Sequence, residues 1–161
     1  MLLAFFMIGC AGYRLGPTNP EMTAGRTIQV DRFENRTLEP NLPEAINHAL
    51  RKQLQQDGSY QLATRSDGNV VIRGVIISYD RSPLAFQPTD VVTVTDFEIR
   101  LVTQLTARDR ATGRLLVDRE VTGRTSVRVG ADLPSAERQA LPLLAADWAR
   151  NATSLLTEGS W

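Results

Sequence analysis

The sequence predicts an α+β fold, an α/β two-layer sandwich in which two helices pack on one face of a mixed, largely antiparallel sheet of four to five strands. Two segments each carry one apolar stripe at helical spacing, and two long segments alternate apolar and polar residues as strands do. A helix stripe and a strand face both need an apolar partner, and packing one layer on the other buries both. The length of 161 residues is that of one domain.

The first half of the domain combines short strands, a helix and a long apolar strand. Asn41 suits the N-cap of a helix, Pro43 falls in its first turn, and Gly58 follows its last turn. The segment of residues 69–81 is apolar on both alternating faces for most of its length, which is typical of a central strand. The expected elements are a strand at 26–34, a helix at 41–57, a short strand at 60–63 and a strand at 69–81.

The second half predicts a long antiparallel hairpin followed by a helix. In residues 97–107 the odd positions are mostly apolar and the even ones mostly polar, and this pattern recurs in 115–129 across a turn at 110–113. Pro142 removes a backbone donor, so we expect the last helix, 133–158, to be divided just before it. The second sheet face mixes positive and negative side chains, which predicts either a solvated surface or a binding face.

Composition argues against an enzyme, a metal protein and a nucleic-acid-binding protein. Eighteen basic residues balance eighteen acidic ones, so the chain lacks the excess positive charge that nucleic acids attract. One cysteine and one histidine cannot build a zinc site, and His48 lies off the apolar stripe of its helix with no candidate nucleophile nearby. No glycine-rich phosphate loop is present in the sequence. We therefore expect no catalytic residue, no metal ligand and no dissociable cofactor.

The first ten residues carry the strongest local signal. Residues 1–8 are almost wholly apolar, too few to span a bilayer as a helix but suited to the apolar part of an export signal. The order Met7, Ile8, Gly9, Cys10 resembles the bacterial lipobox, in which the peptidase cuts before a cysteine that carries diacylglycerol. The alternative is an apolar terminal strand with a chance cysteine.

The lipobox divides the chain into three parts. Residues 1–9 are the signal segment, which we expect to be truncated at its N-terminus because no Lys or Arg precedes Cys10. Residues 10–25 form a lipidated tether rich in Gly, Pro, Thr and Asn, and residues 26–161 form the domain. Two or three acyl chains on Cys10 would hold the protein at a membrane permanently.

Several segments match one protein family in order along the chain. They are Cys10 with Gly12, Tyr13, Arg14 and Leu15, the run 33–37, the helix from Asn41, the turn 58–60 and the hairpin tip 109–113. Together they resemble the lipopolysaccharide-assembly lipoproteins of the LptE type. The resemblance implies a non-enzymatic outer-membrane lipoprotein, anchored on the periplasmic side, that plugs the LptD β-barrel translocon. It would assist the assembly of that barrel and the delivery of lipopolysaccharide to the cell surface.

The resemblance also implies where lipopolysaccharide is contacted, because family members use basic residues at a hairpin end and along the sheet. The planar guanidinium of Arg suits the phosphates of this lipid. The candidates are Arg81, beside an expected loop at 82–90, and Arg108, Arg110 and Arg114, around the other hairpin end. If these two groups lie at opposite ends of the sheet, at most one of them is right.

The expected partner is a protein as well as a lipid. Phe86, expected to be exposed in the loop at 82–90, is a candidate partner contact, or it folds back onto the core. A second reading keeps the anchor and changes the partner. A strand ending in Phe-x-Asn-x-Thr before a helix also resembles periplasmic α/β lipoproteins that activate peptidoglycan synthases or build secretion pores. Such a protein would act as an interaction module.

Overall fold

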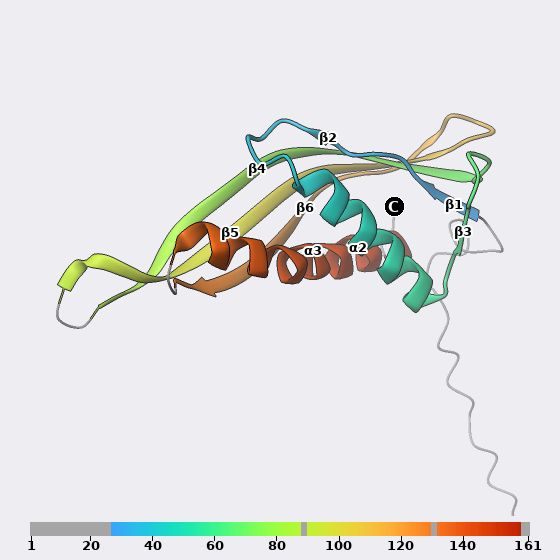
Figure 1. Cartoon of the computed structure of the whole chain (residues 1–161). Coiled ribbons are helices and arrows are strands. Elements are labelled where there is room, and N and C mark those ends of the chain that lie inside the picture. The colour runs from blue at the N-terminus through green and yellow to red at the C-terminus, as the bar shows by residue number, and fades with distance from the viewer. Residues whose placement is uncertain (1–26, 88–89, 130–131, 159–161) are drawn as a thin grey trace, which may run out of the picture.

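The chain folds into a sheet with both helices on one side. The computed structural model describes residues 27–87, 90–129 and 132–158, and Figure 1 shows α2 and α3 lying along the same face of the sheet. The elements are β1 (Thr27–Val30), β2 (Glu34–Asn35), α2 (Leu42–Asp57), β3 (Gln61–Leu62), β4 (Val70–Gln87), β5 (Asp90–Asp109), β6 (Leu115–Arg128) and α3 (Leu133–Glu158). This two-layer arrangement confirms the predicted fold class.

The sheet is mixed, as predicted. Its order is β3-β1-β4-β5-β6, and the two-residue strand β2 also pairs with β4, so the sheet has six strands. β1 pairs in parallel with β3 and β4, β2 pairs in parallel with β4, and the long strands β4, β5 and β6 are antiparallel. The expected strand at 26–34 is therefore two short strands, because the chain leaves the ladder after Val30 and returns at Glu34.

Helix α2 has the predicted bounds and a different start. Its buried stripe consists of Leu42, Pro43, Ile46, Leu50 and Leu54. The predicted side-chain cap is wrong, because Asn41 has helical backbone angles and its side chain makes no capping hydrogen bond. The end is as expected, since Gly58 adopts a left-handed φ of 73° and its N–H donates to the Leu54 carbonyl at 3.2 Å. His48 is exposed, as predicted.

The β4–β5 hairpin is longer than predicted. Residues 82–90 were expected to be a loop, but β4 continues to Gln87 and β5 begins at Asp90, so this prediction is wrong. Ser82 pairs with Glu98 and Pro83 with Phe97, and register shifts beyond Pro83 accommodate the irregular pairing. The segments 82–87 and 90–97 form a two-stranded extension that we call the hairpin arm. Figure 1 shows the arm projecting beyond the helices.

Helix α3 is a single helix of 26 residues, so the predicted division before Pro142 is wrong. The proline ring frees the carbonyl of Arg138 from its helical hydrogen bond. Both residues are exposed, so water can solvate this carbonyl and the helix continues.

The core is centred on Trp148 of α3, which is fully buried. Its ring meets the edge of Phe33 at 5.4 Å between centroids and 88° between planes. Its indole Nε1–H donates to the Thr103 hydroxyl at 2.8 Å. Gly123 lets α3 approach β6 closely, because a Cβ at that position would lie 2.5 Å from the Trp148 Cβ. Gly74 similarly leaves room for the Phe33 ring.

Candidate functional site

The two predicted arginine groups lie toward opposite ends of the sheet. Arg81 pairs in register with Ile99 and Arg108 with Val71, on the same hairpin. The nine residues from Ile99 to Arg108 span about 30 Å of strand. The structure therefore does not bring the four candidate arginines together. Cys10, the predicted lipidation site, lies outside the described residues.

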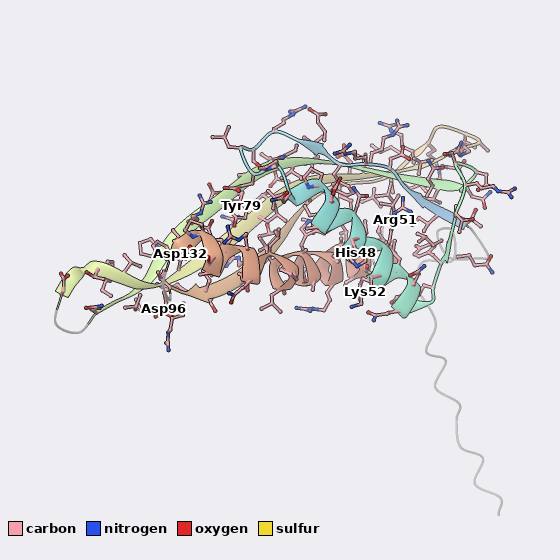
Figure 2. The ribbon with its side chains drawn as sticks, in the orientation of Figure 1. His48, Arg51, Lys52, Tyr79, Asp96 and Asp132 are labelled. Carbon is pink, nitrogen blue, oxygen red and sulfur yellow. The ribbon has the colours of Figure 1, made fainter. Side chains whose placement is uncertain are left out.

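Arg81 ties β4 to both helical segments. Its Nη2 donates to the Glu39 carboxylate at 2.6 Å and to Glu137 of α3 at 3.0 Å, and its Nε donates to the same Glu137 carboxylate. Its guanidinium also lies 5.0 Å from the centre of the Tyr79 ring, which is on the helix side of the sheet (Figure 2). The bonds to Glu137 raise the pKa of Arg81, and burial raises the pKa of Tyr79 to about 12. Most of the donors of Arg81 are thus engaged within the domain.

The opposite end of the sheet carries an open hollow of about 360 Å³ on the face that the helices leave uncovered. We call it the arginine hollow, because three guanidinium groups reach it from β4, β5 and the turn after β5. It is lined by Gln29, Ser66, Val71, Arg73, Thr106, Arg108, Asp109, Arg110 and Gly113.

A chain of polar contacts fixes two of the three arginines. Arg110 donates from Nε to the Gly68 carbonyl at 2.8 Å and from Nη2 to the Gln29 side-chain oxygen. The Gln29 amide donates to one oxygen of Asp31 at 2.5 Å, and Arg73 Nε donates to the other oxygen at 3.0 Å. The hollow is therefore preorganised before any ligand arrives.

Arg108 is held least firmly and Arg114 lies beside the hollow. The Arg108 Nη1 donates to the Gly113 carbonyl at 3.4 Å, close to the limit for a hydrogen bond. The Arg114 carbonyl accepts the Asp109 N–H at 3.0 Å and closes the turn, but Arg114 does not line the hollow. Of the predicted group, Arg108 and Arg110 line the site. Arg114 keeps its role as a lipid contact only as a prediction.

Sequence reasoning missed Arg73. It is the only charged residue in the apolar run 69–79, which was the available signal, but its closeness to Arg108 depends on the pairing of β4 with β5. In that register Arg73 faces Thr106 and Val71 faces Arg108, so both arginines lie on the same sheet face. With a single carboxylate, Asp31, paired to Arg73, the hollow suits a phosphate or another oxyanion.

Phe86 lies on a strand of the hairpin arm and not in a loop. Its side chain is 47% exposed and that of Leu84 is 55% exposed. Phe86 is therefore not folded back onto the core, which leaves the predicted partner contact open. Its role stays a prediction.

Two searches of the described parts of the chain returned nothing. In residues 27–87, 90–129 and 132–158 no group of three or more His, Cys, Asp or Glu side chains is placed to hold a metal ion. Within the same ranges, no helix has the length and apolar character needed to cross a membrane.

Comparison with known families places the chain. The family model described as LptE, lipopolysaccharide-assembly, matches residues 25–156, which is nearly the whole domain. The chain belongs to the LptE family. It is thus a non-enzymatic lipoprotein of the lipopolysaccharide-assembly type. Among curated proteins, none matches this LptE-family sequence.

Solved structures of other lipoproteins and of a hypothetical protein share the LptE-family fold of this chain. The hypothetical protein CT253 from Chlamydia trachomatis has a TM-score of 0.60 at 8% identity, covering 83% of this chain and 96% of that chain. A minor lipoprotein from Acinetobacter baumannii has a TM-score of 0.55 at 15% identity, covering 83% and 94%. The PelC dodecamer from Paraburkholderia phytofirmans has a TM-score of 0.53 at 17% identity, covering 90% and 94%. At these identities the likeness shows the fold alone.

Proposed function

We propose that this LptE-family chain is an outer-membrane lipoprotein, anchored by acyl chains on Cys10 at the periplasmic side. It plugs an LptD-like β-barrel translocon, assists the assembly of that barrel and contributes to the transport and insertion of lipopolysaccharide. The arginine hollow receives a phosphate of this lipid.

The layered structure supports the plug role. The lumen of a large outer-membrane barrel is polar, so a plug needs a polar surface and a core that it buries by itself. Here both helices cover one face of the sheet, and the largest buried side chains face them. The uncovered face carries both charge signs at the positions Arg73, Glu98, Arg100, Asp118 and Arg124.

The arginine hollow is the observation that carries the lipid part of the proposal. Three guanidinium groups line a hollow on the open face, and two of them are already held by Gln29 and Asp31. A phosphate bound there gains charge-assisted hydrogen bonds without first ordering those side chains. Arg108, which has only one long internal contact, is free to turn toward such a ligand.

Binding of purified lipopolysaccharide by the purified domain tests the lipid part. We expect Arg108→Gln to weaken binding about tenfold, because a hydrogen bond to a charged group contributes roughly 1.5–3 kcal/mol. The double variant Arg73→Gln with Arg108→Gln should weaken it further. Lys52→Gln, an exposed position on α2, is the matched control. Equal binding by wild type and the double variant contradicts a phosphate site in the hollow.

Arg81→Gln decides between the two predicted arginine groups. The donors of Arg81 are engaged by Glu39 and Glu137, and it lies about 30 Å along the sheet from Arg108. We expect this variant to keep its lipopolysaccharide affinity at a temperature where it is folded. A loss of affinity in folded Arg81→Gln, with none in Arg108→Gln, would assign the lipid to the other end of the sheet.

The anchor and the barrel are tested in cells. Labelled palmitate should be incorporated into the wild-type chain and lost in Cys10→Ser. A tagged wild-type chain should retain an LptD-like barrel through detergent washing. Recovery of a penicillin-binding protein, or of a homo-oligomeric ring, would favour the alternative in which the chain is a periplasmic interaction module.

A further inference from the structure

Two arginines face each other on the open side of the sheet, away from the arginine hollow. Arg100 of β5 pairs in register with Arg124 of β6, and Asp80 of β4 pairs with Arg100 on its other side. Arg100 lies on the same face of β5 as Arg108, eight residues away, which corresponds to roughly 26 Å. Both arginines are exposed. The row Asp80–Arg100–Arg124 is therefore a separate feature from the hollow.

The domain does not neutralise this pair. Like charges directly opposite on neighbouring strands are destabilising. Within the described ranges, neither the Arg100 nor the Arg124 guanidinium makes an ion pair or a hydrogen bond, and the Arg124 contact with Asp147 is made by its backbone N–H. Arg128, on the same face of β6, is instead paired with Asp96 at 3.0 Å. The isolated domain thus keeps an uncompensated repulsion in the middle of its open face.

The charges around the pair indicate what it binds. Asp80 lies in the same row and Glu98 in the next row of that face, so two carboxylates flank the two arginines and the patch has no net charge. A phosphate-rich lipid meets repulsion from these carboxylates. A protein surface that places one carboxylate between the guanidiniums, and a cation near Asp80 or Glu98, is complementary to both signs.

We propose that Arg100 and Arg124 together clasp an Asp or Glu side chain of the protein against which the open face packs. Each guanidinium donates to one carboxylate oxygen, so the repulsion within the pair becomes attraction to the partner. The inference rests on the proposed function, in which that partner is the LptD-like barrel, and adds the contact by which the barrel wall engages the sheet.

Charge reversal separates this role from a purely structural one. Arg124→Glu places opposite charges in register with Arg100, so the isolated domain should unfold at an equal or higher temperature than wild type. The same variant should retain at least tenfold less of the barrel when the two are co-purified from membranes. Lys52→Glu makes the same change of charge on α2, on the other side of the molecule (Figure 2), and should retain the barrel as wild type does.

Binding of purified lipopolysaccharide is measured on the same variants. Arg124→Glu should bind it as wild type does. Loss of this binding with normal barrel retention would overturn the inference and give the pair a lipid phosphate instead. Normal retention of the barrel by Arg100→Glu combined with Arg124→Glu would also overturn it. If wild type retains no barrel, the proposed function fails, and the partner of this contact is lost with it.

Discussion

Substitution of Gly123 by alanine tests how closely α3 lies on β6. A Cβ at position 123 would lie 2.5 Å from the Cβ of Trp148 and 3.0 Å from its Cα and N atoms. Two of these three atoms are backbone and the third is bonded directly to it, so no side-chain rotation relieves the contact. The helix must move away from the strand.

The magnitude follows from what that movement disturbs. Overpacking a well-packed site costs about 1–3 kcal/mol. Two hydrogen bonds flank the glycine, from the Arg124 N–H to Asp147 at 2.9 Å and from Asn151 to the Thr122 carbonyl at 2.8 Å. Weakening one of them costs about 0.5–1.5 kcal/mol more. Alanine offsets roughly 0.5–1 kcal/mol of this, because glycine loses more backbone entropy on folding. The expected loss of unfolding free energy is about 1–3 kcal/mol.

Urea unfolding followed by circular dichroism measures this difference. Ser126→Ala is the matched control, because it changes an exposed side chain on the same strand and should stay within about 0.5 kcal/mol of wild type. A Gly123→Ala variant as stable as this control would refute the close packing of α3 against β6.

Three further predictions concern the core, the Arg81 contact and the tyrosines. Thr103→Val leaves the buried indole N–H of Trp148 without its acceptor and should lower the unfolding free energy by about 1–3 kcal/mol in urea titrations, with no loss if the bond is absent. Arg81→Met leaves the partly covered Glu137 carboxylate unpaired and should lower the melting temperature at pH 7, whereas at pH 3, where that carboxylate is protonated, the difference should shrink; a pH-independent difference would argue against the ion pair. Burial raises the pKa of Tyr60 to about 12 in the fold from 10.0 in the unfolded chain, so its contribution is fully present below pH 10 and is lost as pH rises toward 12. The urea midpoint of wild type should therefore fall between pH 10 and 12, and Tyr60→Phe should show a smaller fall; an identical fall would assign the effect elsewhere.

Much of the fold follows from local periodicity. The stripe that includes Ile46 and Leu50 defines α2, and the odd positions that include Ile99 and Leu105 define the buried face of β5. These patterns are visible in sequence because a helix and a strand repeat over a few residues and one side of each must be buried. The turn at 110–113 is equally local, and Gly113 adopts the left-handed φ of 70° that glycine tolerates best.

The errors occur where a distant partner overrides local preference. Pro83 and Pro88 suggest a loop, but pairing with residues of β5 continues β4 to Gln87. Pro142 suggests a break, but its exposed position lets water replace the missing hydrogen bond. In both cases the sequence window contains the penalty and lacks the compensating contact.

The candidate site shows the same division. The sequence by itself determined that the protein has two amphipathic helices, alternating strands and no cysteine and histidine set for metal or triad chemistry, because composition and short-range spacing suffice for these conclusions. Only the tertiary structure decided that Arg73 joins Arg108, that Arg81 is engaged elsewhere and that Arg100 faces Arg124. Those neighbours are set by strand register, which aligns residues far apart along the chain and leaves no periodic mark in the sequence.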